Sequence, residues 1–315
     1  MIKTAIAEDD YPTRSAEDEV WITRADPVLW GGPEPTPFVT RAELQEFERN
    51  GFLVKRDLFT EAEICALSEA ANDLRKQPAA KLGGEAIREL ESDALRTLFN
   101  LERHADIFDK LSRSERVAGI ACQILNDDVY IHQSRLNYKP GFSGKEFYWH
   151  SDFETWHAED GMPRARAVSV SILLTDNTAL NGPLMLMPGS QEEFICCQGE
   201  TPENNHETSL QKQDIGTPSK ESLTRLVEKY GIQHITGNAG TAVFFDCNTM
   251  HGSNGNITPF PRSNAFFVFN ALSNRPVAPF AARHPRPDHL GRRTNIAPLA
   301  LTDGRLVEDN EADFA

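Results

Sequence analysis

The chain has 315 residues, a hydrophobic fraction of 39% and a formal net charge of −15, from 32 Lys and Arg against 47 Asp and Glu. This length holds one large domain or two ordinary ones, and the composition excludes a disordered, fibrous or membrane protein. The acidic balance argues against a nucleic-acid partner, because nucleic acids are bound through basic surfaces.

Targeting signals and cysteine usage both favour an intracellular protein. The first ten residues turn acidic before an apolar stretch of signal-peptide length develops, and no apolar run has the length of a membrane span. The cysteines are odd in number, lack Cys-x-x-Cys spacing and include the adjacent pair Cys196 and Cys197. Such cysteines are typical of reduced, structural residues. We therefore expect a cytoplasmic protein with no membrane partner.

The N-terminal part of the chain predicts an extended arm followed by helices. Residues 1–36, called the N-terminal arm below, carry several prolines and many charges without a period, so they are expected to lie over another part of the molecule. Two Thr-x-x-Glu capping boxes, at Thr40 and Thr60, each open a stretch with apolar residues at helical spacing. A third helix is expected from about Ser114 to Leu125.

After residue 128 the period changes from helical to alternating, and short strands dominate. Val129, Ile131, Gln133, Arg135 and Asn137 are expected on one face of the first strand. Further strands are expected at 166–174, 184–187, 241–245 and 264–270. The polar segment of about 192–238 is interpreted as an insertion or lid with one helix from 219 to 230. Helices followed by many short strands indicate a β-sandwich or jelly roll flanked by helices.

A metal site is predicted by His150 and Asp152, which stand two apart in an aromatic-rich run. On a β-strand such residues point to the same face, so both can bind one ion. His251 follows a later apolar run, and a jelly roll can bring that strand beside the first. Two histidines and one carboxylate form a facial triad, which in non-haem Fe(II) oxygenases leaves positions open for a co-substrate and O2.

Two basic residues, Arg262 and Lys139, lie near this predicted site in the sequence, and spacing alone predicts a binding role only for Arg262. Arg262 opens the apolar strand that follows His251. A buried arginine needs an anionic partner, and here it can form a bidentate pair with the distal carboxylate of a dicarboxylic co-substrate. Lys139 ends the strand that carries Gln133, where spacing alone favours a solvated lysine.

The aromatic residues and the third histidine of the run allow more than one interpretation. Trp149 alternates with the ligands and is expected to pack away from the metal. Trp156 lies past the strand, where a place in the wall of a substrate pocket and a place in the core are both open. His157 is spaced oddly from both His150 and Asp152, so it is expected to be an outer-shell or surface residue.

The segment from Phe147 to Pro163, FYWHSDFETWHAEDGMP, resembles the signature of the ectoine hydroxylases, a branch of the phytanoyl-CoA dioxygenase-like superfamily. Supporting matches lie at 10–14, 133–141 and 183–190, so the resemblance covers nearly the whole chain. It implies a mainly β double-stranded β-helix (jelly roll, cupin-like) with flanking helices. The single dioxygenase domain is expected to comprise the N-terminal arm, helical support at 37–128, a jelly-roll core at 129–275 with the insertion 192–238, and a tail at 276–315.

The same resemblance implies an activity and the residues that carry it. Fe(II), 2-oxoglutarate and O2 would convert ectoine into 5-hydroxyectoine, with release of succinate and CO2, in a cytoplasmic enzyme that is a homodimer. The residues that match the family's pattern are His150, Asp152 and His251 for iron, Lys139 and Arg262 for 2-oxoglutarate, and Gln133 and Trp156 for the substrate. For Lys139, the role implied by the resemblance replaces the expectation of a solvent-exposed lysine.

Three alternatives remain open from the sequence. A related oxygenase would hydroxylate another small amino or imino acid. A halogenase of this type needs a small residue in place of the carboxylate ligand, so Asp152 argues against it. A catalytically silent jelly roll that binds a small ligand is a different class of function, and the intact triad together with Arg262 argues against it.

Overall fold

The structure is a computed structural model that describes residues 9–15, 18–89, 94–210 and 214–307. Residues 1–8 of the N-terminal arm and 308–315 of the predicted tail lie outside the described residues. The described α-helices are α1 (Arg41–Asn50), α2 (Glu61–Arg75), α3 (Ala79–Leu82), α4 (Leu101–His104), α5 (Asp106–Arg113), α6 (Ile120–Leu125), α7 (Asp152–Thr155), α8 (Asn205–Ser209) and α9 (Lys220–Tyr230). The described strands are β1 (Val20–Thr23), β2 (Phe52–Lys55), β3 (Ala86–Arg88), β4 (Leu95–Phe99), β5 (Val129–Lys139), β6 (Phe147–His150), β7 (Ala167–Leu173), β8 (Leu184–Leu186), β9 (Glu193–Cys196), β10 (Gln233–Ile235), β11 (Ala242–Asp246), β12 (His251–Ser253) and β13 (Arg262–Ala271).

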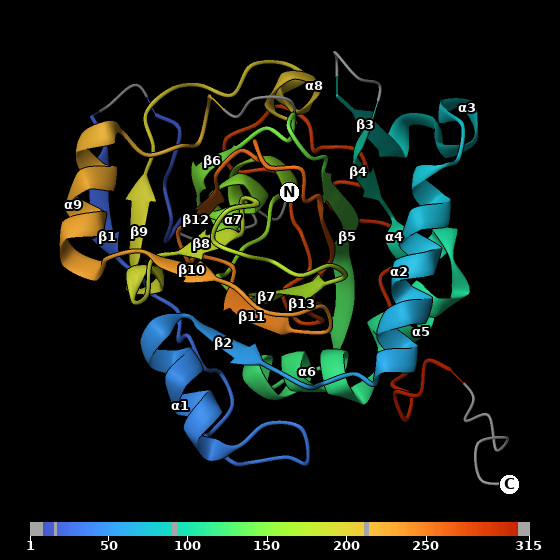
Figure 1. Cartoon of the computed structure of the whole chain (residues 1–315). Helices are drawn as coiled ribbons and strands as arrows, with labels where there is room; N and C mark the ends of the chain where they lie inside the picture. The colour runs from blue at the N-terminus through green and yellow to red at the C-terminus, as the bar shows by residue number, and fades with distance from the viewer. Residues whose placement is uncertain (1–8, 16–17, 90–93, 211–213, 308–315) are drawn as a thin grey trace, which may run out of the picture.

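Two antiparallel sheets face each other and form the jelly roll (Figure 1). The larger sheet has the strand order β2-β11-β7-β13-β5-β4-β3, and the smaller has the order β10-β8-β12-β6. Apolar side chains from the facing sides form one buried cluster, in which Phe245 and Phe266 of the larger sheet meet Leu186 of the smaller sheet. The predicted mainly β fold with flanking helices is therefore confirmed.

Helices cover the outer face of the larger sheet, as Figure 1 shows for α2, α5 and α6. The largest apolar cluster of the described residues lies between these helices and the sheet, and it includes Phe47 of α1, Leu67 of α2, Ile124 of α6 and Phe267 of β13. This cluster uses the alternate residues of β7, β11 and β13, which leaves the other residues of those strands to point between the two sheets.

Both predicted capping boxes open helices. Thr40 and Thr60 accept the backbone N–H groups of Glu43 and Glu63, whose side chains bond back to the cap backbone. Gly51 ends α1 with a left-handed φ of 78°. A Cβ at this position would lie 2.4 Å from the Gln191 side chain, so the close approach as well as the backbone conformation requires glycine.

The third predicted helix has a different start from the one expected. Ser114 caps the segment by accepting the backbone N–H of Arg116, but residues Glu115–Gly119 form a π-helical turn, and regular α-helix begins only at α6. The segment still buries Val117 and Ile124 as the helical spacing predicts.

A β-bulge in β5 corrects the predicted alternation of that strand. Ile131 lies opposite Phe269, but Gln133 lies opposite Val268, so His132 is an extra residue without a directly opposed partner. The prediction that Val129 and Ile131 share a face with Gln133 and Arg135 is therefore wrong. The two apolar residues point to the helices, whereas Gln133 and the alternate residues after it point between the sheets.

The N-terminal arm and the polar segment 192–238 lie side by side. β1 of the arm pairs with β9 in a separate antiparallel ribbon, seen beside α9 in Figure 1. The predicted helix from 219 to 230 is α9, and Ser219 caps it. The segment also contributes β10 to the smaller sheet, next to β8. Tyr11 of the arm is fully buried, so the arm packs over the core as expected.

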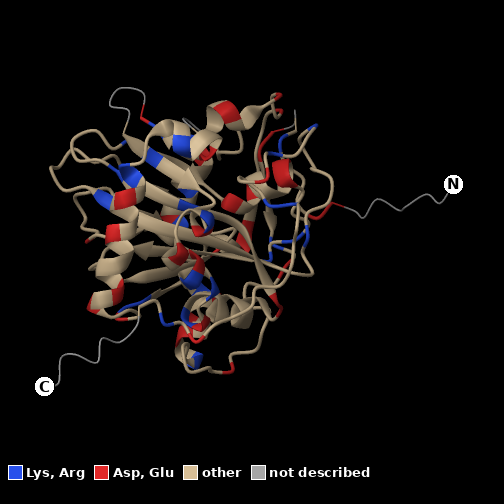
Figure 2. Ribbon diagram, turned by 90° about the vertical axis from the view of Figure 1, so that its right-hand side faces the viewer, with Lys and Arg blue, Asp and Glu red and all other residues tan. Residues whose placement is uncertain are grey.

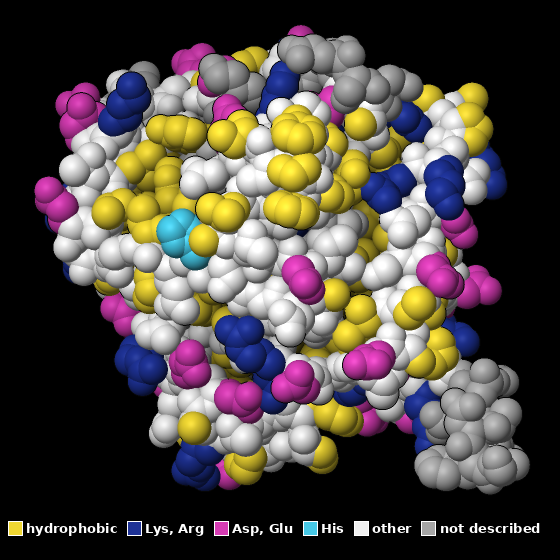
Figure 3. Space-filling model, viewed as in Figure 1, with side chains coloured by type: hydrophobic (Ala, Val, Ile, Leu, Met, Phe, Trp, Pro, Cys, Tyr) yellow, Lys and Arg dark blue, Asp and Glu magenta, His cyan; other side chains and the backbone are white. Residues whose placement is uncertain are grey.

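Charged residues of both signs are spread over the molecule. Figure 2 shows acidic and basic positions interspersed, without a continuous basic stripe in that view. In Figure 3 hydrophobic side chains gather in the upper half of the face shown, and charged side chains lie mainly around its rim and lower half. Within the described residues, no helix combines the length and the apolar character needed to cross a membrane.

Candidate metal centre

The structure brings together the three residues predicted to bind a metal. β6 and β12 are antiparallel neighbours, and His150 at the end of β6 lies directly opposite His251 at the start of β12. The expectation that Asp152 lies on the same strand as His150 is wrong, because β6 ends at His150 and α7 begins at Asp152. The turn between them is held by the Ser151 hydroxyl, which donates to the Asn248 side-chain oxygen at 2.9 Å.

The ligand atoms of the triad lie close enough to share one ion. His150 Nε2 is 3.6 Å from Asp152 Oδ1, and His251 Nε2 is 3.7 Å from Asp152 Oδ2. One ligand atom from each residue lies within 4.8 Å of those of the other two. Asp152 and His251 are buried, and His150 is half-buried.

Hydrogen bonds prepare both imidazoles for metal binding. His150 Nδ1 donates to the Tyr148 carbonyl at 2.7 Å, and His251 Nδ1 donates to the Thr249 carbonyl at 3.0 Å. The proton on each Nδ1 leaves the Nε2 lone pair free to bind a cation. Two such nitrogens and a carboxylate are the donor set of non-haem Fe(II) sites, so the residues present fit that metal.

The surroundings of His251 and Asp152 lower the pKa of both groups. Burial lowers the pKa of His251 to about 4, and the neighbouring His150 adds to this effect. Burial by itself would raise the pKa of Asp152, but the attraction of His251 and the hydrogen bond with His150 outweigh it, so this pKa is lowered. A neutral imidazole and an ionised carboxylate are the forms that bind metals.

A pair of buried cations lies beyond the triad. Lys139 and Arg262 are directly opposite each other on β5 and β13, and each is at most 2% exposed. Lys139 Nζ donates to the Ser253 hydroxyl at 2.8 Å, and Arg262 donates to the Gly182 carbonyl. Neither forms an ion pair with a carboxylate of the described residues, and Arg262 Nε has no hydrogen-bond partner there. The expectation from spacing of a solvated lysine is wrong.

Burial of these two cations is costly without an anion. It lowers the pKa of Lys139 to about 6, with Arg262 as the next cause, and lowers the pKa of Arg262 to about 10. Buried charges are normally paired, so two that face each other mark a place for a negatively charged group. Ser253 lies two residues after His251 on β12, about 6 to 7 Å along the strand. A five-carbon dicarboxylate bridges such a span.

Gln133 and Trp156, the predicted substrate residues, lie on the same side of the larger sheet. The Gln133 amide donates to the Leu290 carbonyl at 2.7 Å and accepts from Arg135. Trp156 belongs to the π-helical turn Trp156–Asp160, is 2% exposed and packs in one cluster with Val268, the residue opposite Gln133. Trp156 is therefore a buried core residue that also lies beside the strand carrying Gln133, so the two alternatives, core packing and a place in the pocket wall, are compatible.

The two remaining aromatic predictions can now be placed. Trp149 packs against an apolar cluster that includes Met187 and Met250, away from the triad, as expected. His157 is 1% exposed in the structure, so it is not a surface residue. Its Nδ1 contacts the Met162 carbonyl at 2.8 Å and its Nε2 contacts Asp9 at 3.0 Å, which fixes the turn after Trp156.

Three residues near the triad, Arg135, Ser253 and Phe266, were not assigned a role from the sequence. Arg135 lies over the Phe266 ring, 4.7 Å from its centroid, and burial lowers its pKa. Ser253 contacts Lys139, as described above. All three follow predicted site residues at even spacing, because Arg135 is two residues after Gln133, Ser253 is two after His251 and Phe266 is four after Arg262. A period of two along the strands was the signal that would have found them.

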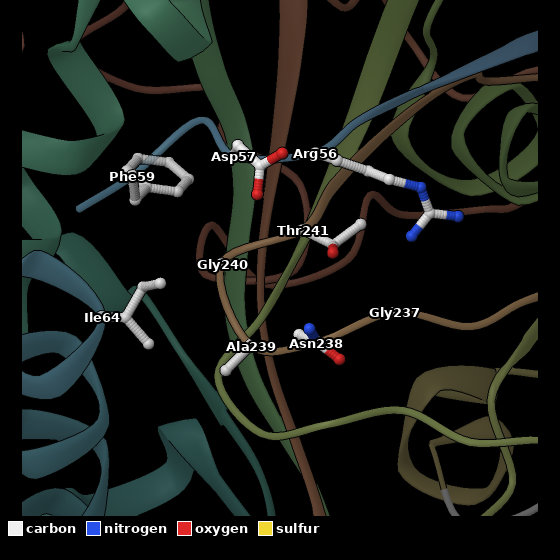
Figure 4. A pocket seen from close by; sticks show the side chains of 9 residues that line it. All are labelled: Arg56, Asp57, Phe59, Ile64, Gly237, Asn238, Ala239, Gly240 and Thr241. Carbon is white, nitrogen blue, oxygen red and sulfur yellow. The ribbon is translucent and has the colours of Figure 1, made fainter. Parts of the chain in front are cut away.

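A small pocket elsewhere on the molecule is separate from this site. Its volume is about 150 Å³, and Figure 4 shows it between the segment of Arg56 and Phe59 and the turn from Gly237 to Thr241. None of its lining residues belongs to the triad or to the buried cation pair. It therefore plays no part in the metal centre.

Comparison with known proteins gives the family of this chain. Residues 47–264 match the family described as phytanoyl-CoA dioxygenase (PhyH). The chain is 50% identical to the ectoine dioxygenase of Stutzerimonas stutzeri, over 93% of this chain and 97% of that protein. It is 51% identical to the ectoine dioxygenase of Streptomyces coelicolor, over 92% of this chain and 97% of that protein.

Comparison with solved structures supports the same family assignment. The crystal structure of EctD from S. alaskensis with 2-oxoglutarate and 5-hydroxyectoine matches with a TM-score of 0.86 at 45% identity, over 95% of this chain and all of that one (100%). The carbocyclase SnoK from nogalamycin biosynthesis, at 17% identity and a TM-score of 0.62 over 88% of this chain and 98% of that one, shares the fold. The chain belongs to the phytanoyl-CoA dioxygenase family and, within it, to the ectoine dioxygenases.

Proposed function

We propose that this protein is an Fe(II)- and 2-oxoglutarate-dependent dioxygenase that hydroxylates ectoine to 5-hydroxyectoine, with O2 consumed and succinate and CO2 released. The observation that carries the proposal is the triad of His150, Asp152 and His251 together with the buried cations Lys139 and Arg262, which have no carboxylate partner among the described residues. The substrate is supported by the ectoine dioxygenases at 48% to 51% identity and by the EctD structure that holds 5-hydroxyectoine.

In this proposal His150, Asp152 and His251 would hold the iron. When bound, Fe(II) supplies the oxidising chemistry, in which decarboxylation of 2-oxoglutarate and reduction of O2 drive insertion of one oxygen atom into a substrate C–H bond. The chain contributes orientation. The carbonyls of Tyr148 and Thr249 hold the two imidazoles in one tautomer and direction, with Nε2 available to a metal ion.

Lys139 and Arg262 are proposed to bind the distal carboxylate of 2-oxoglutarate. The guanidinium presents a planar fork suited to a carboxylate, and the ammonium adds charge and a hydrogen bond from the opposite strand. Because both cations are already buried, a bound carboxylate removes the cost of their isolation. Ser253, which contacts Lys139 and lies two residues from His251, is proposed to line the path between them.

Gln133 and Trp156 are proposed to bind ectoine, with Arg135 beside them. Ectoine is small, cyclic and zwitterionic, so it needs hydrogen-bonding groups and an apolar wall. Gln133 offers an amide on the inner side of β5, and Trp156 offers a buried aromatic surface next to it. Arg135 forms no ion pair with a carboxylate of the described residues, so we place an anionic group of a bound molecule near it.

The direct test is a reaction of the purified protein with Fe(II), ascorbate, 2-oxoglutarate and ectoine. We expect a product heavier by one oxygen atom in mass spectrometry, formed together with succinate in equal amounts. Reactions without ectoine and with proline in its place serve as controls. Release of succinate that does not depend on ectoine, with no oxygenated product, would contradict the assignment, and faster conversion of proline would favour the alternative substrate class.

The buried Lys139 predicts a pH dependence for co-substrate binding. With a pKa of about 6 the amine is mostly neutral above pH 6 in the ligand-free protein, whereas a bound carboxylate favours the charged form. Binding therefore takes up a proton, and the affinity for 2-oxoglutarate should fall as the pH rises above 6, by up to about tenfold per pH unit. Calorimetric titrations from pH 6 to 9 measure this slope, which should disappear in Lys139→Met and would count against the proposal if that variant kept it.

We also propose that the chain works as one catalytic domain, in the cytoplasm and as a homodimer. The contacts of the N-terminal arm with β9 and the place of β10 in the smaller sheet support a single domain. The free thiols of the five cysteines support a reducing compartment. Exposed apolar side chains on neighbouring loops, Phe142 and Phe260, support a subunit contact. Sedimentation at the mass of one chain would contradict the dimer.

A further inference from the structure

The N-terminal arm reaches both chain segments that carry the buried metal ligands. The whole arm precedes β2, and it lies outside residues 47–264, the part that matches the general family. Two of its arginines, Arg14 and Arg24, are nevertheless buried at 5% and 8% exposure. Each forms an ion pair with a buried carboxylate close in sequence to a ligand, Glu154 after Asp152 and Asp246 before His251.

Arg14 holds the short helix that begins with Asp152. Its Nε and Nη2 atoms donate to the two carboxylate oxygens of Glu154, both at 2.9 Å, which is a bidentate pair. Nη1 donates to Glu159 at 2.5 Å, on the turn that also carries Trp156. The Thr13 hydroxyl adds a third bond to Glu154, at 2.9 Å. Glu154 lies two residues after Asp152 on α7, so these contacts fix the orientation of the helix.

The backbone of Arg14 is itself held in an uncommon conformation. Its φ of 55° lies in the left-handed region that residues other than glycine seldom adopt. Its N–H donates to the Cys197 carbonyl at 2.8 Å, next to β9. The arm is therefore fixed on one side by the strand ribbon and directs the guanidinium to α7 on the other.

Arg24 holds the loop that leads to His251. Nη1 and Nη2 donate to the two oxygens of Asp246 at 2.6 Å and 2.9 Å, again a bidentate pair. Asp246 ends β11 and accepts the backbone N–H of Asn248 at 2.8 Å. The Asn248 side chain accepts from Ser151, the residue between His150 and Asp152. One series of contacts thus runs from the arm to the turn between two ligands.

We propose that Arg14 and Arg24 are positioning residues, through which the N-terminal arm sets the geometry of the metal ligands Asp152 and His251. The inference rests on the proposed Fe(II) site. The carboxylates of Glu154 and Asp246 are buried, and both oxygens of each are hydrogen-bonded. Each ion pair therefore has one orientation, and it fixes a chain segment that lies only a few residues from a metal ligand. Partners outside the ligand set tune metal affinity in this way.

Metal affinity tests the inference without relying on catalysis. Co(II), whose visible absorption reports its ligand geometry, is titrated into the wild-type protein and into Arg14→Lys and Arg24→Lys, which keep the charge and lose the planar fork. We expect Co(II) to bind about 10-fold to 100-fold more weakly in each variant, with altered absorption bands. Hydroxylation should recover as the Fe(II) concentration is raised.

Milder variants and a matched control keep the test decisive if either lysine variant fails to fold. Glu154→Gln and Asp246→Asn preserve shape and should weaken Co(II) binding in the same direction, with folding checked by circular dichroism. Arg164→Gln breaks ion pairs of the same arm, to Asp10 and Asp26, and removes no atom of the two bidentate pairs of Arg14 and Arg24. It should leave Co(II) affinity unchanged.

The outcomes separate the two proposals. If the wild-type protein binds no Co(II), the metal site itself is wrong. If it binds Co(II) and the folded Arg14 and Arg24 variants bind equally well with the same spectrum, the positioning role is wrong and the metal site stands. Equal weakening in Arg164→Gln would assign the effect to general loosening of the arm and would also overturn the inference.

Discussion

His251→Ala is expected to abolish substrate-dependent succinate release while the protein remains folded. The imidazole is one of three ligands, and its loss should lower turnover more than 100-fold, beyond the range that loss of an outer-shell partner causes. The fold should survive because the side chain contributes one neutral hydrogen bond, to the Thr249 carbonyl, worth about 1 kcal/mol. Metal titration and circular dichroism measure the two effects separately.

The control for this variant is His234→Ala, an exposed histidine on β10 of the same sheet. It should retain both metal binding and turnover. An unfolded His251→Ala protein would instead indicate that His251 is a packing residue of the core. A folded variant with wild-type metal affinity would remove His251 from the ligand set.

Arg262→Gln is expected to remove most of the affinity for 2-oxoglutarate. Loss of one partner of a buried charge pair costs about 2 to 5 kcal/mol, which corresponds to a factor of about 30 to several thousand in the dissociation constant. Without ligand the variant should be at least as stable as the wild type, because it no longer buries a guanidinium that lacks a carboxylate partner among the described residues.

Two measurements distinguish this role from a structural one. The unfolding temperature should rise with added 2-oxoglutarate in the wild type and stay constant in Arg262→Gln, because ligand binding stabilises only a protein that binds it. Metal affinity in the absence of 2-oxoglutarate should be the same in both proteins, since Arg262 contacts none of the triad. A strongly destabilised variant that still binds 2-oxoglutarate would show that Arg262 serves the fold.

Local features of the sequence were sufficient for the helices and for the composition of the metal site. The Thr-x-x-Glu boxes at Thr40 and Thr60 act within one turn, so their outcome does not depend on distant contacts. The triad was also predictable, since His150, Asp152 and His251 are the residue types that the chemistry needs and the strand order of a jelly roll brings them together. The bulge at His132 was not, because alternation of residue types does not show where one strand has an additional residue.

By itself the sequence determined the composition of a candidate metal site and predicted Arg262 as a partner for a dicarboxylate, because side-chain chemistry and spacing are local properties. Only the tertiary structure decided the protonation and the partners of these groups. Lys139 has the sequence surroundings of a solvated lysine, and the pairing of β5 with β13 buries it opposite Arg262 and lowers its pKa to about 6. Likewise, Arg14 and Arg24 lie more than a hundred residues from the carboxylates that they bind. Charge interactions and burial depend on distances in space, and those distances are set by the packing of the two sheets and the arm.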